Sequence, residues 1–574
     1  MERSLELAPE ETATAAAAAG ANLSPADMAA ADGARGERAW ALERGGIVVV
    51  LALVLLVLVG FALRAQGLAE LGFAEDEINK LEAARAYGRG DITPNAEHPM
   101  LMKTLVFLSL RASEAWNARG RAGDTPPRLD ISEEAAVRLP NVLFGALSVV
   151  PLYLLTAAFF GRRTGLVAAL LWASGVNAIT YNRIAKEDTL LVFFMLFAFY
   201  FYLRAKQTSG YEPRAKRRFY FGSAVSFGLM LASKYFPHYF GLNMLYHHLC
   251  AQREREPGEP RGRTPAVFYP LVLVTFLVAN PAVLLPQTWD YLTAYSSEGL
   301  LTHHGYLMGE TLYPNQMSRT PFGTPVYFYL LFLAIKTPLP LLVAFLAGLV
   351  ACARRWRRPG EAFLLLMFLL WIVPYSLAGA KWLRYAHSLL PIVYMLAAVG
   401  IMWLLRLGAS RVERGGKFSP LRVVRAVVFL TFVALPAWLA YDAAPHYATY
   451  TNALGAGRAG YYFPHDEFYD DGLREAIQYV VAHAPERASI VHETPGVARY
   501  YLEKFGRPNI ASRVLSDQLF DLDISEPRPL YVILQRGRTY YENRDKMRNV
   551  RARGRKVYEG FVGGVSAVEV YEVK

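Results

Sequence analysis

Cysteine is almost absent from this sequence. Its 574 residues include only two, Cys250 and Cys352, and each lies at an end of an apolar run. On the topology derived below both ends face the cytosol, so the extracytoplasmic part of the chain has no disulfide of its own. Internal repeats are also missing, and residues 442–574 carry neither a glycine-rich phosphate loop nor metal-ligand spacing. That region therefore shows no signal of a nucleotide or metal site.

Apolar residues, in contrast, are abundant and grouped into long runs. They make up 53% of the chain, and about 20 consecutive apolar residues let a helix cross a membrane. Eleven candidate spans follow: 47–64, 137–160, 164–181, 188–205, 219–236, 238–250, 266–286, 325–351, 361–378, 385–406 and 421–441. The sixth is short, and is either re-entrant or a continuation of the fifth past Pro237. We predict a polytopic α-helical membrane protein with about 11 transmembrane helices and a C-terminal soluble α/β domain.

The positive charge is distributed between alternate loops. The formal net charge is +12, and the basic loops are Arg162-Arg163, Arg204–Arg218, Arg253–Arg263, Arg354–Arg358 and Arg406–Lys417. The positive-inside rule makes these loops cytoplasmic. The N-terminus is then inside, whereas the 65–136 loop, the 287–324 loop and the C-terminal region are outside. Because the basic clusters are short and juxtamembrane, we expect no nucleic-acid partner.

Three regions follow from this pattern. Residues 1–46 are rich in alanine without an apolar core, which predicts a disordered cytoplasmic tail. Residues 47–441 form the membrane domain, beginning with an uncleaved anchor. Residues 442–574 form a soluble extracytoplasmic domain, in which helices to about His483 and from Pro495 to Phe505 alternate with strands at 489–492, 530–534 and 565–573. Asp470-Asp471 is expected to cap the first of these helices.

The first outer loop carries two groups of acidic residues. Ile78, Leu81 and Ala84 recur at helical spacing after Glu75-Asp76-Glu77, which predicts an amphipathic helix over 75–89 that lies on the membrane surface. The acidic residues either cap this helix or act in catalysis. The second group, Glu97-His98-Pro99, precedes another apolar helix start, where proline fixes the turn.

These motifs resemble the phospho-dolichol-mannose–protein mannosyltransferase family, which belongs with the lipid A aminoarabinose transferases to the GT-C superfamily. The resemblance covers roughly residues 47–405. It rests on these motifs, in order: Asp76-Glu77, Glu97-His98-Pro99-x-Leu101-x-Lys103, Arg138-Leu139-Pro140 with Gly145, Asn182-Arg183-Ile184 through Asp188, Lys234, Lys336-Thr337-Pro338, and Lys381 to Pro391. The chain departs from the family in reading Glu-His-Pro-Met, and its 287–324 loop is too short for the large sugar-binding-like domain of eukaryotic members. The short loop argues against a protein acceptor and points to a bacterial member, whose place would be the inner (plasma) membrane.

The resemblance implies transfer of mannose or a related sugar from a polyprenyl-phosphate carrier to an acceptor on the extracytoplasmic face. Asp76 would be the base, with Glu77 as the alternative. Glu97, His98 and Asp188 would bind the acceptor or the sugar. The cations that would hold the lipid phosphate are Arg138, Arg183, Lys234, Lys336, Lys381 and Arg384. One base and one in-line displacement predict inversion at the sugar carbon, by analogy with inverting glycosidases.

Each of these basic residues also has a structural interpretation. Lys234 can snorkel to the interface, Arg183 and Asp188 can cap a span, Arg138 can anchor an interface, and Lys381 with Arg384 can form a solvated pair. Lys336 is harder to explain, because an unpaired lysine inside a span costs about 2.5–3.5 kcal/mol. Pro338 and Pro340 can break that helix and open a cavity around it.

The resemblance also implies which molecules the protein binds. The partners are the membrane lipid carrier and a protein, lipid or glycan acceptor. No cofactor is firmly implied beyond the donor substrate, and no metal is expected, although His303-His304 admits that interpretation. The main alternative is a transporter or flippase of lipid-linked sugars, but such proteins tend to carry paired repeats. A non-catalytic scaffold is the third, and it leaves Lys336 unexplained.

Overall fold

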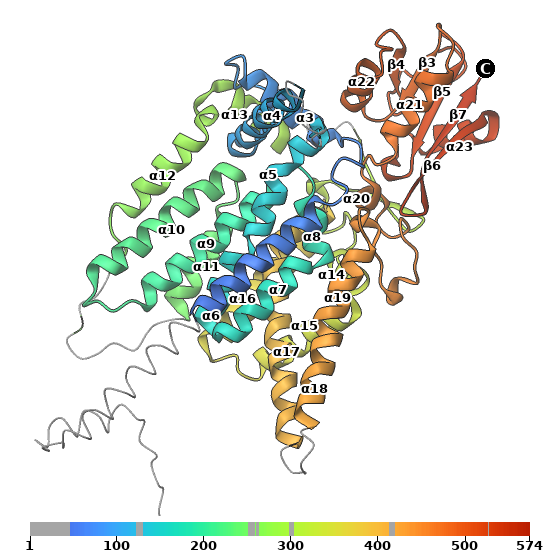
Figure 1. Cartoon of the computed structure of the whole chain (residues 1–574). Helices are drawn as coiled ribbons and strands as arrows, with labels where there is room; N and C mark the ends of the chain where they lie inside the picture. Colours follow the sequence, from blue (N-terminus) through green and yellow to red (C-terminus); the bar gives the residue numbers. More distant parts are fainter. Residues whose placement is uncertain are drawn as a thin grey trace, which may run out of the picture. The chain divides into compact units, whose positions relative to one another are not determined.

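The structure is a computed structural model that describes residues 46–121, 130–250, 259, 263–297, 303–412, 420–525 and 527–574. The predicted cytoplasmic tail lies outside the described residues, apart from Gly46. A helix spans Gly46–Ala65, and the chain divides within it into two compact units, residues 1–55 and 56–574. Every contact reported below lies within the second unit, which Figure 1 shows with its helices and strands labelled.

Helices dominate the region before residue 442. They are α3 (Glu75–Tyr87), α4 (Met100–Arg121), α5 (Glu133–Leu147), α6 (Val149–Phe160), α7 (Arg162–Ser174), α8 (Val176–Asn182), α9 (Asp188–Gln207), α10 (Pro213–Ser233), α11 (His238–Leu249), α12 (Phe268–Ala279), α13 (Pro286–Ser296), α14 (Phe328–Lys336), α15 (Leu339–Ala353), α16 (Pro359–Leu377), α17 (Leu390–Val412), α18 (Pro420–Phe429) and α19 (Leu435–Asp442). A short hairpin, β1 (Tyr306–Met308) and β2 (Thr311–Tyr313), lies in the second predicted outer loop.

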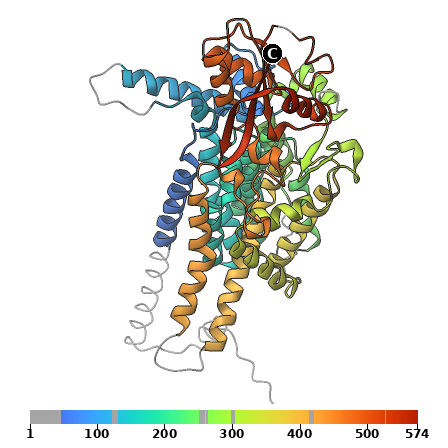
Figure 2. The same ribbon diagram turned by 90° about the vertical axis from the view of Figure 1, so that its right-hand side faces the viewer.

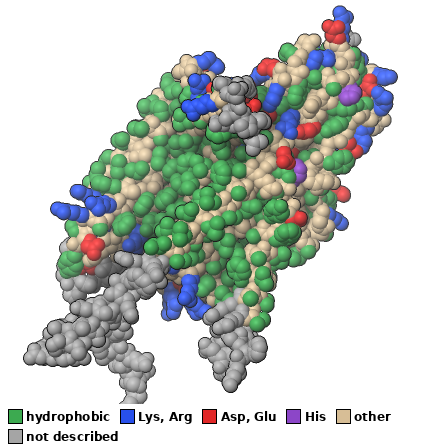
Figure 3. All heavy atoms as spheres, viewed as in Figure 1, with side chains coloured by type: hydrophobic (Ala, Val, Ile, Leu, Met, Phe, Trp, Pro, Cys, Tyr) green, Lys and Arg blue, Asp and Glu red, His purple; other side chains and the backbone are tan. Residues whose placement is uncertain are grey.

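Five helices in the described residues are long and apolar enough to cross a membrane. They are Gly46–Ala65, Glu133–Phe160, Asp188–Gln207, Pro359–Leu377 and Leu390–Leu407, and the bent pair α7–α8 makes a sixth if it is one span. Hydrophobic side chains also cover much of the bundle face seen in Figure 3, and charged ones gather towards its ends. The chain is therefore a multi-pass membrane protein. Each of the eleven predicted ranges contains helix, but the count of eleven spans stays a prediction.

Two helix breaks have local causes. Between α7 and α8 the axis turns by 57° at Gly175, where a Cβ would collide with the Tyr394 hydroxyl. Between α14 and α15 the helix stops at Lys336 and resumes after Pro338, because proline restricts the residue before it to extended conformations. The predicted break beside Lys336 is confirmed.

The loop that we predicted to be the first outer one, with its acidic residues, folds in part as expected. Helix α3 begins at Glu75 and α4 begins directly after Pro99. The apolar side of α3 does not lie on a membrane surface, however. Ile78, Leu81 and Ala84 are at most 1% exposed, because they belong to a hydrophobic core shared with α4, α5 and the C-terminal domain. The prediction of a surface-lying helix is therefore wrong.

The C-terminal domain is a five-stranded mixed sheet with helices on its two faces (Figures 1 and 2). Its elements are α20 (Pro464–Phe468), α21 (Leu473–His483), β3 (Ser489–His492), α22 (Pro495–Lys504), β4 (Ala511–Val514), β5 (Leu530–Gln535), α23 (Arg544–Arg553), β6 (Arg555–Val562) and β7 (Val565–Val573). The strand order is β4-β3-β5-β7-β6, with β3 parallel to β4 and β5, and β7 antiparallel to β5 and β6.

Alternation along β5 explains the two faces of the sheet. Ile533 packs into the core shared with α21, α22 and α3, whereas its neighbours Val532 and Leu534 pack against α23. The three strands and two helices expected here are confirmed. The predicted cap of α21 is wrong, because Gly472 holds the N-cap position and Asp470 accepts hydrogen bonds from Arg538 instead.

Candidate functional site

Asp76 lies where the membrane domain meets the C-terminal domain. Its Oδ2 atom is 2.7 Å from Nζ of Lys186 and 3.9 Å from Nη1 of Arg384. The Tyr469 hydroxyl donates a hydrogen bond to the same oxygen. The Asp76 side chain keeps 23% of its surface exposed and Arg384 keeps 19%. Four elements distant in sequence thus converge on one accessible carboxylate.

The charges around Asp76 decide its protonation. Burial alone would raise its pKa, but Lys186, Arg384 and Lys80 together hold the pKa of Asp76 well below its usual value. The group is therefore a carboxylate at neutral pH. It accepts hydrogen bonds there, and it becomes a better proton acceptor when another anion draws Lys186 or Arg384 away.

Tyr469 was missed in the sequence and comes from the loop after α20. Its backbone has φ = 53°, an uncommon conformation for a residue other than glycine. Such a conformation persists only where the surroundings hold it, and it clusters at functional sites. Burial and the Asp76 carboxylate raise the pKa of Tyr469 well above its usual value, so its hydroxyl stays protonated and donates to Asp76.

The segment between α8 and α9 supplies three successive charges to the site. Lys186 pairs with Asp76. Glu187 lies 2.8 Å from Nζ of Lys80. Asp188 opens α9 and lies 2.7 Å from Nζ of Lys234, which also stands over the Tyr385 ring. The three ion pairs therefore hold this segment between α3, which carries Asp76 and Lys80, and Lys234 at the end of α10.

Glu97 and His98 lie in a turn that two neighbours hold in place. Lys103 donates to the carbonyl oxygens of Asn95 and His98 at 2.5 and 2.8 Å, and Asn95 donates to Oε1 of Glu97 at 2.6 Å. Nδ1 of His98 is 4.0 Å from Oε1 of Glu187. Burial holds the pKa of His98 well below its usual value despite Glu187. The structure thus places His98 beside the segment that carries Lys186.

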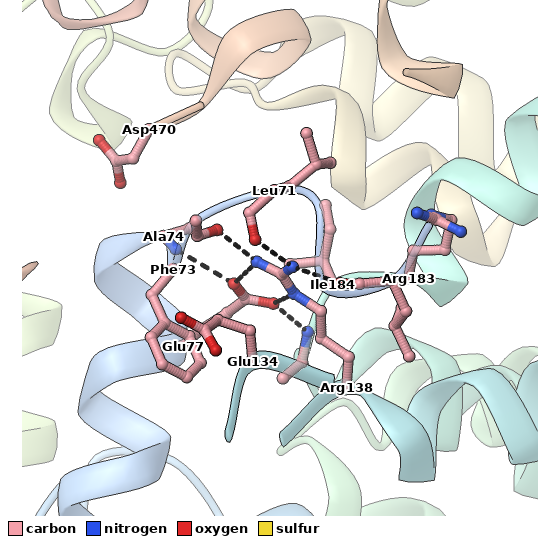
Figure 4. Close-up of polar contacts among 12 residues, drawn as sticks. Leu71, Phe73, Ala74, Glu77, Glu134, Arg138, Arg183, Ile184 and Asp470 are labelled. Atoms are coloured by element: carbon pink, nitrogen blue, oxygen red, sulfur yellow. Dashed lines mark hydrogen bonds and ion pairs between the residues drawn. The ribbon is translucent and has the colours of Figure 1, made fainter. Parts of the chain in front are cut away.

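Glu77, the alternative base, is buried and hydrogen-bonded to neighbouring protein groups (Figure 4). It is 1% exposed and forms two hydrogen bonds with Arg138, at 2.8 and 2.6 Å. It also accepts from the backbone N–H groups of Ala185, at 3.0 Å, and Ala74, at 3.1 Å. The contact with Ala74 is the N-terminal cap that the sequence allowed for these acidic residues. Glu77 and Arg138 together pin α3 to α5 and to the loop before α9.

The other predicted phosphate ligands are held by protein groups. Arg183 donates to the carbonyl oxygens of Arg64, Gln66 and Gly67. Lys336 is 4% exposed, lies 3.0 Å from Oε1 of Glu467 and donates to two backbone carbonyls. Lys381 is fully buried and donates to the carbonyl oxygen of Thr324 at 2.6 Å. Of the six predicted cations, only Arg384 contacts Asp76, and Lys234 contacts Asp188.

His303 and His304, in the second predicted outer loop, contact the C-terminal domain. His304 lies 2.6 Å from Glu542, and His303 stacks on Tyr540 and lies 3.1 Å from the Ser516 hydroxyl. Within the described ranges, no three His, Cys, Asp or Glu side chains are grouped as metal ligands. Among the described residues these contacts of the two histidines are with Glu542, Tyr540 and Ser516, and none is with Asp76.

Comparison with known proteins gives one match by sequence. Residues 128–285 match the sequence model of the family described as dolichyl-phosphate-mannose-protein mannosyltransferase. The matched range contains Lys186, Glu187, Asp188 and Lys234, but not Asp76. No protein of curated function matches the sequence.

Several solved structures are similar at low identity. ArnT from Cupriavidus metallidurans bound to undecaprenyl phosphate is 15% identical, with 91% of this chain and 97% of that chain covered and a TM-score of 0.46. The oligosaccharyltransferase of Archaeoglobus fulgidus is 11% identical, with 81% and 64% covered and a TM-score of 0.48. The S. cerevisiae Pmt1-Pmt2 complex bound to the sugar donor is 15% identical, with 46% and 38% covered and a TM-score of 0.29. The match over residues 128–285 confirms the resemblance to the dolichyl-phosphate-mannose–protein mannosyltransferase family that the motifs predicted.

Proposed function

We propose that this protein is an integral membrane glycosyltransferase that moves a sugar from a polyprenyl-phosphate carrier to an acceptor on the extracytoplasmic face. The observation that carries the proposal is the partly exposed Asp76 carboxylate beside Lys186 and Arg384. A base next to two cations suits this chemistry, because the reaction takes a proton from the acceptor and leaves negative charge on the phosphate. The family match supports the same substrate class.

In the proposed reaction one bond to the sugar forms, one breaks, and Asp76 takes up the proton that is released. An acceptor hydroxyl or amine attacks the anomeric carbon, and the bond from that carbon to the phosphate oxygen breaks. The acceptor proton passes to Asp76, and the bonding electrons leave with the lipid phosphate. Attack opposite the leaving group inverts the sugar carbon. Lys186 and Arg384 would stabilise the phosphate as its charge grows.

The low pKa of Asp76 fits this sequence of events. In the free protein, Lys186 and Arg384 lower the pKa of Asp76, which makes it a weak base. A donor phosphate that attracts the same cations would raise the pKa of Asp76. We infer that the base gains strength when the donor is bound, while Tyr469 keeps the carboxylate oriented through its hydrogen bond.

The remaining predicted residues take positioning roles in this proposal. His98 and Glu97, beside Glu187, face the acceptor or sugar, and Asp188 keeps Lys234 near the phosphate. Glu77, Arg138, Arg183, Lys336 and Lys381 hold the fold around the site. Mannose or a related sugar is the proposed donor group, and the proposed location is a bacterial inner membrane with the C-terminal domain outside.

The test is donor consumption by the full chain in proteoliposomes. Radiolabelled polyprenyl-phosphate mannose is supplied with an extract of membrane acceptors, and free polyprenyl phosphate and labelled product are counted. A transferase releases the lipid phosphate and labels an acceptor in equal amounts. Movement of intact donor between leaflets without its consumption would instead identify a flippase and overturn the proposal.

A further inference from the structure

A polar cavity lies at the opposite end of the bundle from Asp76. Its volume is about 640 Å³, and its lining comes from the ends of α6, α9 and α11, the loop between α15 and α16, the start of α16, and Arg406 of α17. Helix α9 runs from Asp188, beside the catalytic site, to Gln207, which lines this cavity. Its 20 residues span about 30 Å, one hydrocarbon thickness. The cavity thus belongs to the other membrane face.

Basic side chains dominate the lining. Arg355, Arg358, Arg406 and Lys206 all border the cavity, against a single carboxylate, Glu361. The three arginines are exposed, and in the part of the chain that the structure describes none has a carboxylate within 4.0 Å. Unpaired guanidinium groups around a cavity favour an anion, and phosphate matches their planar donor geometry.

Uncharged donors in the cavity point to the same ligand. His247 lines it, is 3% exposed, and neither ring nitrogen has a hydrogen-bond partner among the described residues. A buried polar group without a partner costs free energy unless a ligand or water satisfies it. The first turn of α16, from Pro359 to Glu361, also lines the cavity, and the N–H groups of a helix start bind anions.

An apolar groove adjoins this cavity. The two share Phe160 and Arg406, and the groove has a volume of about 1010 Å³. Its walls are largely apolar, from Val167 on α7, Ile401 on α17 and Phe429 on α18 among others, and Arg162 and Arg163 lie at one side. A basic cavity that continues into an apolar groove matches a molecule with a phosphate at one end and a hydrocarbon chain at the other.

We propose that this face of the protein binds an anionic phospholipid, with its phosphate among Arg355, Arg358, Arg406 and His247 and one acyl chain in the adjoining groove. Basic clusters at the ends of membrane helices attract anionic headgroups, and here the cluster encloses a cavity with an unsatisfied buried donor. The site is about a membrane thickness from Asp76, so it is separate from the sugar-transfer site and does not depend on it.

The experiment is a lipid titration of the intact chain followed by native mass spectrometry. Dioleoyl phosphatidylglycerol is the anionic probe, and dioleoyl phosphatidylcholine is the zwitterionic reference. We expect phosphatidylglycerol to bind with at least about tenfold preference, and Arg358→Gln with Arg406→Gln to remove most of that preference. Arg357→Gln is the matched control, because this exposed arginine stacks on Trp356 and does not line the cavity.

A second variant and a competition experiment complete the test of this lipid site. If the double variant does not fold, His247→Phe tests the same site, since a phenyl ring retains the ring packing against Tyr202 and Tyr246. Equal binding of phosphatidylglycerol by the native chain and a folded variant would overturn the proposal. Full displacement of the lipid by glycerol phosphate would also overturn it, because the site would then hold a free phosphate and not a lipid.

Discussion

Lys186 places its ammonium group 2.7 Å from the Asp76 carboxylate, and only 7% of its side chain is exposed. A nearly buried cation beside a partly exposed carboxylate fixes the charge of that carboxylate. It also supplies a positive charge where a leaving phosphate would develop its negative charge. Lys186 therefore links the two tasks of the proposed reaction, proton transfer and leaving-group stabilisation.

Replacing Lys186 by methionine should change the pH dependence of transfer. Lys186 lowers the pKa of Asp76, so the carboxylate of the native protein stays ionised well below neutral pH. Without Lys186 the pKa rises, and the acidic fall in initial rate should move to higher pH. Loss of one electrostatic contact should also lower kcat by about 10²-fold. Lys186→Arg keeps the charge and should restore much of both effects, whereas an unchanged profile in the methionine variant would contradict this role.

Tyr469→Phe should lower kcat with little change in KM for the donor. The variant keeps the ring and loses only the hydroxyl that donates to Asp76. A hydrogen bond to a charged group contributes about 1.5–3 kcal/mol, which corresponds to a loss of roughly ten- to a hundredfold. Tyr462→Phe, on the same segment, is the control and should retain full activity. Comparable kinetics for the two variants would remove Tyr469 from the site.

Arg138→Met should destabilise the whole membrane domain. The substitution leaves the buried Glu77 carboxylate without its partner, and breaking a buried ion pair costs about 3–5 kcal/mol. The midpoint of thermal unfolding in detergent, followed by intrinsic fluorescence, should fall by several degrees or more. Asp523→Asn removes an exposed partner of Arg553 and should leave the midpoint unchanged. A native-like midpoint for Arg138→Met would show that this pair contributes little.

Glu493 should make the C-terminal domain less stable as pH rises. Burial raises the pKa of this carboxyl to about 7, and the side chain is 2% exposed. The folded state therefore binds the proton more tightly than the unfolded state, and stability falls between about pH 4.5 and 7. Glu493→Gln should remove up to about 3 kcal/mol of that loss. Thermal unfolding at pH 5 and 8 tests this, and the variant should exceed the native chain only at pH 8.

The sequence predicted the fold well because the fold follows local patterns. The apolar runs, Pro99 at the start of α4 and the strand-like runs at β3, β5 and β7 all match the structure. Strands β4 and β6 were missed, since Ala511–Val514 and Arg555–Val562 are largely exposed or polar and lack a clear apolar pattern. Periodicity reports burial, so it is weakest on edge strands.

The site could be predicted only in part. Two adjacent acids at a helix start have the same sequence signal, yet Glu77 caps α3 and Asp76 pairs with Lys186. The run Lys186-Glu187-Asp188 between two apolar segments was a readable signal that we used only for Asp188. No signal in the sequence pointed to Tyr469. It lies 393 positions from Asp76, and only the tertiary fold brings the two residues together. Lys336 and Lys381 both donate hydrogen bonds to backbone carbonyl oxygens. A side-chain motif in the sequence cannot reveal such partners.

Sugar transfer by Asp76→Asn, measured with a labelled polyprenyl-phosphate donor in proteoliposomes, tests directly whether Asp76 is the base. Asparagine keeps the shape of the side chain and cannot accept the acceptor's proton. Asp91→Asn, on the same loop and exposed, is the matched control, and thermal unfolding checks that both variants are folded. If Asp76 is the base, Asp76→Asn should transfer sugar at a rate at least about 10²-fold lower, and Asp91→Asn should keep the native rate. Native transfer by a folded Asp76→Asn protein would show that Asp76 is not the base.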